Sequence, residues 1–150
     1  MWLWIGEIGL FEIYGLPQGF CFCLLLFIIY SPKLFKIIGD QLPEAHCYAD
    51  DTQLYLSLNP RSGESQTAAI NAMECCIEKI RTWMIRDKLT INDTKTEFIL
   101  IGTRQQLCKL QSCTISVGYD IINATTQVKN LGCWLDSHRN MSTYVTRVCK

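Results

Sequence analysis

Apolar residues recur with the two-residue period of a β-strand in the middle of the chain. Two strand-like segments, residues 45–49 and 52–58, meet at Asp50-Asp51, and in the second segment leucines alternate with polar or aromatic residues. This alternation is typical of a strand with one buried face. Aspartate is rare inside strands and common in turns. The pattern therefore predicts a β-hairpin with Asp50 and Asp51 at its tip.

The period then changes to that of an amphipathic helix. Apolar residues step by three and four along one face, at Ile70, Met73, Ile77, Ile80 and Met84. This spacing predicts a long helix whose stripe packs in the core. Ser65 is the predicted N-cap, and the helix is expected to end near Lys88. Its solvated face is expected to carry the cations Lys79, Arg81, Arg86 and Lys88.

Shorter patterns predict the remaining elements. Strands are expected at residues 2–5, 10–14, 97–101 and 128–135, the last with Gly132 inside it, and a hairpin at 112–117 and 120–122. Helices are expected from residue 20, with a break or kink at Pro32, and within residues 141–149. Hairpins combined with one long helix, without repeats or a linker, predict an α+β fold in a single unit.

Composition and charge exclude several classes of protein. The chain has 150 residues, of which 49% are hydrophobic and 19% charged, and this excludes a disordered or collagen-like chain. Fourteen basic and fourteen acidic residues balance, but residues 1–75 are acidic and residues 76–150 basic. That asymmetry suits a metal-dependent enzyme acting on a polyanion, and it also occurs in unrelated proteins. None of the nine cysteines forms a C-x-x-C pair, so reduced thiols are expected rather than a cysteine metal cluster.

The apolar run at residues 20–30 raises the question of a membrane span. Its 11 residues are followed at once by Ser31, Pro32 and Lys33. A span needs about 20 apolar residues, so a buried core helix is favoured, and a span around residues 20–38 stays open as an alternative. No Lys or Arg precedes residue 20, so no secretory signal is predicted. The protein is expected in the nucleus or cytoplasm and is not expected to be secreted.

The tetrapeptide Tyr48-Ala49-Asp50-Asp51 is the strongest candidate for chemistry. Adjacent carboxylates repel each other, and a divalent cation relieves the repulsion. Mg²⁺ prefers hard oxygen ligands and takes one or two carboxylates together with substrate phosphates, an arrangement suited to phosphoryl transfer. A solvent-exposed Asp-Asp turn without function is the alternative, and the tetrapeptide alone does not decide between the two.

Five blocks of sequence occur in an order and spacing that decide between a metal site and a turn without function. They are GLPQG at 15–19, LLFIIY at 25–30, HCYADDTQLYLS at 46–57, WMIRDKLTINDTKTEFILIGTRQQL at 83–107, and VKNLGCWLDS at 128–137. Together they resemble the reverse transcriptase of non-LTR (LINE-type) retrotransposons, from about residue 13 to 150. The resemblance implies the palm of a polymerase, a small antiparallel sheet backed by helices. It also implies Mg²⁺-dependent DNA synthesis from a DNA primer on an RNA template.

The resemblance also implies roles for individual residues. The nucleotide- and template-binding positions are Gly15, Pro17, Gln18, Gly19 and Tyr48. Catalysis is assigned to Asp50 and Asp51, which would bind the metal, and to Lys95 near the triphosphate. Leu131 and Gly132 would grip the primer strand, with the glycine permitting close approach of another backbone. Without the resemblance, a surface lysine in a loop before a strand is the preferred interpretation of Lys95, and a β-bulge is the alternative for Gly132.

Two departures from the family pattern bear on activity. The family takes another metal-binding aspartate from an upstream strand, whereas residues 1–14 hold Glu7 and Glu12 but no Asp. After Gly19, the sequence 20–24 reads FCFCL where the family has a small residue, a Gly and a Pro. Residues 1–150 are therefore expected to be a partial reverse transcriptase domain, without the fingers and the first aspartate strand, and inactive alone. A polymerase completed by a second chain and an inert or weakly nucleic-acid-binding relic are the alternatives.

Overall fold

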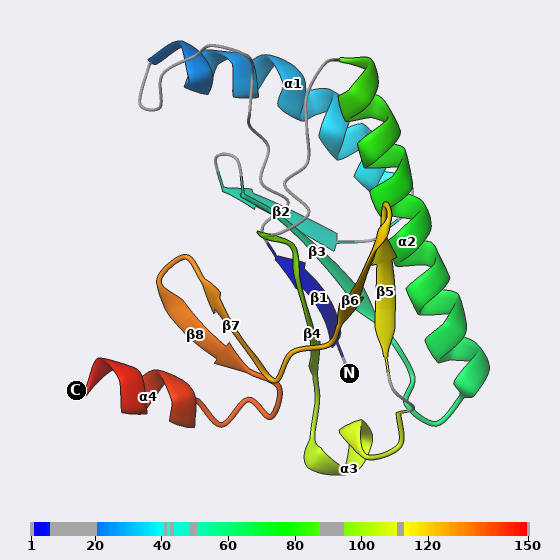
Figure 1. The fold of residues 1–150 in the computed structure, drawn as a ribbon, viewed down its shortest axis with the longest axis vertical. Coiled ribbons are helices and arrows are strands. Elements are labelled where there is room, and N and C mark those ends of the chain that lie inside the picture. The colour runs from blue at the N-terminus through cyan, green and yellow to red at the C-terminus, as the bar shows by residue number, and fades with distance from the viewer. Residues whose placement is uncertain are drawn as a thin grey trace.

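A computed structural model describes residues 2–6, 21–40, 42, 44–48, 51–87, 95–110 and 113–149. The first six elements are β1 (Trp2–Gly6), α1 (Cys21–Gly39), β2 (Glu44–Tyr48), β3 (Asp51–Ser57), α2 (Gly63–Arg86) and β4 (Glu97–Ile101). The others are α3 (Arg104–Leu107), β5 (Thr114–Val117), β6 (Asp120–Asn123), β7 (Gln127–Asn130), β8 (Cys133–Asp136) and α4 (Ser142–Val148). The expected α+β class is confirmed (Figure 1).

Four strands form one antiparallel sheet in the order β2-β3-β1-β4. With helices after β1 and after β3, the chain follows the β-α-β-β-α-β order of the split βαβ motif. The hairpin expected in the middle of the chain is present as β2 and β3. The strand expected at 10–14 lies outside the described residues.

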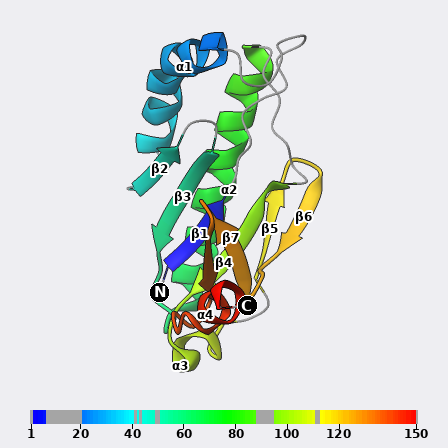
Figure 2. The same ribbon diagram turned by 90° about the vertical axis from the view of Figure 1, so that its left-hand side faces the viewer.

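The main core fills the space between one face of this sheet and the helices α1 and α2 (Figures 1 and 2). The predicted helical stripe is confirmed, because Met73, Ile77, Ile80 and Met84 are each no more than 2% exposed. Ile70 lies at the edge of the same core and is partly buried. From the sheet, Leu54 and Phe98 are fully buried in this core.

A second, smaller cluster covers the opposite face of the sheet. Ile99 of β4 and Val128 of β7 are fully buried there, with Tyr55 and Leu135 packed against them. The β7–β8 hairpin therefore covers the face that the helices leave open. The alternation in β3 explains this arrangement, because Leu54 faces the helices and Tyr55 faces the hairpin.

Helix α1 continues through Pro32, so of the expected break or kink the break is absent. Proline has no N–H and leaves the carbonyl four residues earlier without its helical donor. That carbonyl belongs to Ile28, and the Ser31 hydroxyl donates a hydrogen bond to it at 3.2 Å. The neighbouring serine thus supplies the donor that proline lacks. No helix in the described part of the chain is apolar enough over a sufficient length to cross a membrane.

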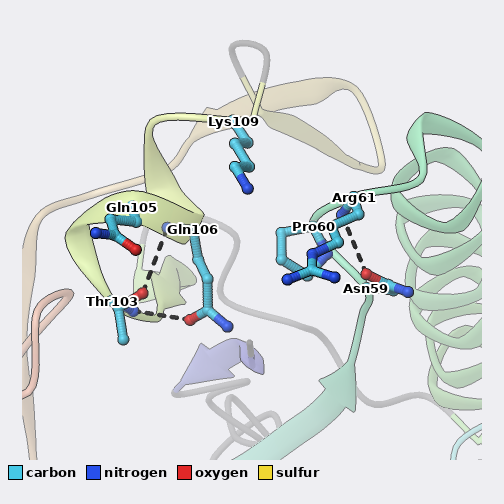
Figure 3. Close-up of a pocket in the computed structure, with 7 residues that line it drawn as sticks. All are labelled: Asn59, Pro60, Arg61, Thr103, Gln105, Gln106 and Lys109. Carbon is cyan, nitrogen blue, oxygen red and sulfur yellow. Dashed lines mark hydrogen bonds between the residues drawn. The ribbon is translucent and has the colours of Figure 1, made fainter.

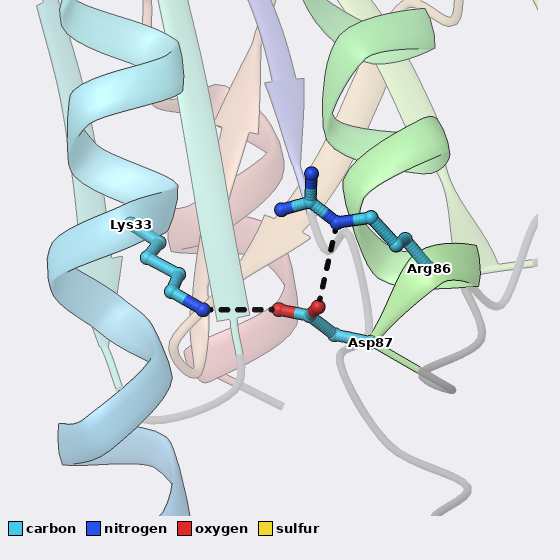
Figure 4. A network of polar contacts seen from close by, with 3 residues as sticks. All are labelled: Lys33, Arg86 and Asp87. Carbon is cyan, nitrogen blue, oxygen red and sulfur yellow. Dashed lines mark ion pairs between the residues drawn. The ribbon is translucent and has the colours of Figure 1, made fainter.

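The ends of α2 differ from the expectation by a few residues. Its N-cap is Ser62 rather than Ser65, and the Ser62 hydroxyl accepts from the backbone N–H of Ser65 at 3.3 Å. At the other end Asp87 is the C-cap, one residue before the expected limit. Its carboxylate lies 3.6 Å from Lys33 Nζ of α1 and 3.6 Å from Arg86 Nε (Figure 4). The pair with Lys33 joins the two core helices, and the two cations offset a carboxylate placed at the unfavourable end of the helix dipole.

The prediction of a single strand at residues 128–135 is wrong. The segment forms the β7–β8 hairpin, with register pairs from Gln127↔Asp136 to Asn130↔Cys133. Leu131 and Gly132 form its two-residue turn, with φ of 45° and 84°. Positive φ at both central residues defines the turn that matches strand twist, so Gly132 is a turn residue and not a bulge. The other predicted hairpin, β5–β6, is present across Gly118-Tyr119.

Candidate active site

The β2–β3 hairpin ends at the pair Tyr48↔Asp51, so β3 begins with Asp51. The two connecting residues, 49 and 50, lie outside the described residues, as does the side chain of Asp51. A two-residue connection is the commonest hairpin turn. Tyr48, the last residue of β2, is 67% exposed. The backbone therefore places the start of the Asp51 strand and an exposed aromatic ring at one end of the sheet.

Lys95 belongs to the same end of the sheet. It is exposed and lies two residues before β4, whose first residue Glu97 pairs with Gly6, the last residue of β1. Since β1 lies between β3 and β4, the register brings the start of β4 level with the start of β3. Two strand spacings separate β3 from β4, or about 10 Å. An ammonium group is thus available on one side of the Asp51 strand.

The β7–β8 turn is held close to this end by a partly buried hydrogen bond between two side-chain amides. Gln53, two residues after Asp51, is 4% exposed, and its Nε2 donates to Oδ1 of Asn130 at 2.5 Å. The Tyr55 hydroxyl donates to Oε1 of the same glutamine. Asn130 directly precedes the turn residue Leu131, which is 52% exposed. A cross-sheet hydrogen bond therefore connects the strand of Asp51 to the turn of Leu131 and Gly132.

Within the described residues, no other part of the chain approaches Gly132 closely. A Cβ at this position would meet nothing within 4 Å, so its requirement for glycine comes from its φ of 84°. Leu131 also has positive φ, which is uncommon for a residue other than glycine and is strained for a bulky side chain. Strained residues gather at functional sites, where the surrounding structure holds them in place.

A cavity of about 410 Å³ separates the sheet from the β7–β8 hairpin on its far side. His46 and Tyr55 line it with their rings edge to face, 5.4 Å apart. Its remaining lining residues are Glu44, Ile101, Leu135, Asp136 and Arg139. The cavity extends from the sheet to β8 and the residues after it, so the β7–β8 hairpin contacts the sheet only in part.

The thiol of Cys47 faces Thr52 across the β2–β3 hairpin, with Sγ and Oγ1 3.5 Å apart. Burial raises the pKa of the Cys47 thiol, and the hydrogen bond to Thr52 acts in the opposite direction. The thiol therefore stays neutral at pH 7, which makes it a poor nucleophile. Within the described residues, no three His, Cys, Asp or Glu side chains come together to hold a metal ion.

The arrangement is that of a strand bearing aspartate, flanked by a lysine and by a strained turn. A family model described as "Reverse transcriptase (RNA-dependent DNA polymerase)" matches residues 3–135. The chain belongs to the reverse transcriptase family. The match covers most of the chain and includes residues 3–6 of β1, which lies before the five blocks of sequence. No curated protein and no solved structure matched the chain significantly.

Members of the reverse transcriptase family act on a nucleic-acid template and primer and generally use Mg²⁺. Among the residues that the sequence singled out, Tyr48, Lys95, Leu131 and Gly132 are described in full, and all lie toward the Asp51 end of the sheet. The turn at 15–19 and Asp50 lie outside the described residues. Sequence reasoning missed Gln53 and Asn130, although Gln53 falls on the polar face of the predicted strand.

Proposed function

We propose that this chain forms the palm of a non-LTR retrotransposon reverse transcriptase. The observation that supports the proposal is the register of the sheet. It brings the start of β3 and the residues before β4 to one end of the sheet, and the Gln53–Asn130 hydrogen bond holds the β7–β8 turn close to that end. These are the positions of Asp51, Lys95 and Leu131-Gly132, to which the family pattern assigns metal, triphosphate and primer. The split βαβ order also suits a palm, in which a small sheet is backed by helices.

In this proposal each residue at this end of the sheet has a separate role. Asp50 and Asp51 hold the metal, and the exposed ring of Tyr48 stacks near the primer end. Lys95 neutralises or protonates the departing pyrophosphate, for which an exposed ammonium is chemically suited. Leu131 and Gly132 hold the primer strand, and the Gln53–Asn130 bond sets their separation from Asp51. Gly15, Pro17, Gln18 and Gly19 contact the nucleotide and template.

The carboxylates of Asp50 and Asp51 are ligands of the chemical type that Mg²⁺ prefers. Two adjacent carboxylates supply hard oxygen ligands, and Mg²⁺ in proteins commonly binds one or two carboxylates together with substrate phosphates. When bound, the ion stabilises the negative charge that develops during phosphoryl transfer. The protein's part is to hold Asp51 at the start of a paired strand of the four-stranded sheet.

We also propose that the purified chain does not extend primers. Transfer with two metals needs carboxylates from more than one strand. The strand that pairs with β3 on the side away from β2 is β1, and its sequence, Trp-Leu-Trp-Ile-Gly, holds no carboxylate over Trp2–Gly6. The substituted segment at 20–24 further alters the family's nucleotide-binding turn. Nucleic-acid binding through the basic second half is the property that we expect to remain.

A primer-extension assay tests both statements. The purified chain is incubated with a primed RNA template, deoxynucleotides and Mg²⁺ or Mn²⁺, beside the double variant Asp50→Asn, Asp51→Asn. We expect no extension above background from either protein. Extension by the wild-type chain that disappears in the double variant would show that the carboxylates are catalytic and that the proposed inactivity is wrong. Salt-sensitive binding of the primed template, measured in the same samples, tests the remaining interaction with nucleic acid.

A further inference from the structure

A polar pocket lies between the loop that precedes α2 and the short helix α3. Its volume is about 380 Å³, and its lining residues are Asn59, Pro60, Arg61, Thr103, Gln105, Gln106 and Lys109. Figure 3 shows the Lys109 ammonium and the Gln106 amide extending into the space between the two segments, with Arg61 on the opposite side. The pocket follows the C-terminal end of β3, whereas Asp51 is at the N-terminal end. The length of that seven-residue strand separates the two, or about 23 Å.

Two side-chain amides that line the pocket accept hydrogen bonds from backbone N–H groups through their carbonyl oxygens. Thr103 and Gln106 form a capping box, in which Oε1 of Gln106 accepts from the Thr103 N–H at 2.9 Å. On the other side, Oδ1 of Asn59 accepts from the Arg61 N–H at 3.1 Å. Each bond fixes the position of the carbonyl oxygen and, with it, of the NH₂ group on the same amide. The NH₂ group of Gln106 is thereby held as a donor in the pocket, whereas that of Asn59 points away from Gln106 and Lys109 (Figure 3).

The charges of the pocket have a single sign. Arg61 and Lys109 contribute a guanidinium and an ammonium, neither of which can accept a hydrogen bond, and none of the seven lining residues carries a carboxylate. A site with two cations and oriented N–H donors is complementary to an oxyanion, most of all to phosphate. Planar guanidinium and amide NH₂ groups match the spacing of phosphate oxygens.

We propose that this pocket binds a phosphate group, either a phosphodiester of single-stranded RNA or a free phosphate ion. The site is separate from the Asp51 end and does not rest on polymerase activity. On an extended strand, an anchor about 23 Å from the hairpin tip would hold nucleic acid away from the chemistry. Phosphate contacts of this kind position a strand without reading its sequence.

Gln106→Glu is the sharpest test variant. Glutamate is a standard partner in the capping box, so the helix start and the thermal stability should be preserved. The substitution nevertheless replaces the NH₂ donors with a negatively charged oxygen inside the pocket. The second variant is Arg61→Ala, Lys109→Ala. Its matched control is Lys36→Ala, Lys79→Ala, which removes the same charge from exposed positions outside the pocket.

Binding of inorganic phosphate and of a short single-stranded RNA is measured by titration calorimetry on the full chain. We expect Gln106→Glu and the pocket double variant to weaken binding about tenfold, and the control double variant to change it less than twofold.

The two ligands distinguish the natural source of the phosphate. If it is RNA, the pocket double variant also makes the slope of log affinity against log salt concentration shallower, by about 0.7 for each phosphate that is no longer bound. If only the binding of inorganic phosphate responds, the pocket takes the free ion. Equal binding by wild type, Gln106→Glu and the pocket double variant would overturn the proposal, as would an equal weakening in the control.

Discussion

Leu131 is one of three non-glycine residues with positive φ in the described part of the chain. It has φ of 45° and a side chain 52% exposed, at the first central position of the β7–β8 turn. That position favours asparagine, aspartate or glycine, because these residues tolerate the left-handed region. A leucine there gives up stability while presenting an apolar side chain to solvent. This is consistent with selection for contact with a ligand, which the proposed function takes to be the primer.

We therefore expect Leu131→Asn to stabilise the fold. The free energy of unfolding should rise by about 0.5–1 kcal/mol, because asparagine followed by Gly132 suits this turn. Chemical denaturation measures the change. Leu131→Ala is the matched control, since it removes the exposed side chain but keeps a residue strained at positive φ. The prediction fails if the asparagine variant is no more stable than the alanine variant.

Cys76 shows how burial changes the chemistry of a thiol. It is fully buried on α2, and burial, with the neighbouring Cys75, raises the pKa of its thiol to about 12, while Lys79 acts in the opposite direction. A thiol with a raised pKa stabilises the folded state below its unfolded pKa and loses that contribution as the pH rises toward 12. At pH 7 it is a small apolar group, as the sequence had suggested for several of the cysteines.

At the scale of elements, different interactions stabilise the two core helices, α1 and α2. Helix α2 has an apolar stripe, an N-cap at Ser62 and a C-cap at Asp87. In helix α1, by contrast, the apolar residues Ile28 and Ile29 are 57% and 67% exposed. Near its end, Leu34 and Ile38 are buried in the core. The end of α1 is therefore held by packing, and Lys33 adds the ion pair to Asp87.

The start of α2 provides a prediction at this scale. Ser62→Ala should lower the free energy of unfolding by about 1 kcal/mol, because it removes the acceptor for the Ser65 N–H. Thr67→Ala, at an exposed position in the first part of the same helix, should change it by less than about 0.5 kcal/mol. Thermal or urea unfolding distinguishes the variants. A larger effect from Ser65→Ala than from Ser62→Ala would show that the helix begins three residues later.

The C-terminal helix α4 is attached only weakly to the rest of the fold. Helix α4 has no buried residue, and its N-cap, Met141, makes no side-chain capping bond. Its contact with β8 includes the Arg147 guanidinium, which lies 3.9 Å from the centre of the Trp134 ring. A cation–π contact at an exposed site contributes only about 0.5–1 kcal/mol, so α4 depends on the β7–β8 hairpin for its position.

At the scale of the whole molecule, the partly buried hydrogen bond between Gln53 and Asn130 connects two parts of the fold. The four-stranded sheet holds Gln53, and the separate β7–β8 hairpin holds Asn130, 77 residues later. The apolar cluster of Ile99 and Val128 also joins these parts, but it lies away from the β7–β8 turn. Removal of the amide pair should therefore loosen the turn end of the hairpin without unfolding the sheet.

We expect Asn130→Ala to lower the free energy of unfolding by about 1–3 kcal/mol, because it leaves the buried Gln53 amide without its acceptor. Hydrogen exchange should also become faster at the β7–β8 amides than at those of β5–β6. Asn123→Ala is the matched control, because Asn123 ends an exposed strand of another hairpin. Unchanged exchange in β7–β8 would show that the apolar cluster alone fixes this hairpin.

The sequence alone determined most elements of the main sheet and its helices. Period-2 alternation located the β2–β3 hairpin, and the spacing of three and four located α2 with its buried Met73, Ile77 and Ile80. These features are local, because a repeated pattern of apolar side chains records which face of an element is buried. The family could also be recognised from the sequence, since its motifs are short segments in a fixed order.

Only the tertiary structure decided where those elements meet. No local pattern shows that β1 lies between β3 and β4, that Gln53 bonds to Asn130, or that the loop at 59–61 faces α3. The turn at Leu131-Gly132 was missed because a leucine with positive φ carries no turn signal of its own. Of the break or kink expected at Pro32, the break does not occur, because the Ser31 hydroxyl, one residue away, satisfies the carbonyl of Ile28. Contacts between distant residues depend on three-dimensional packing, which the period of a single element does not encode.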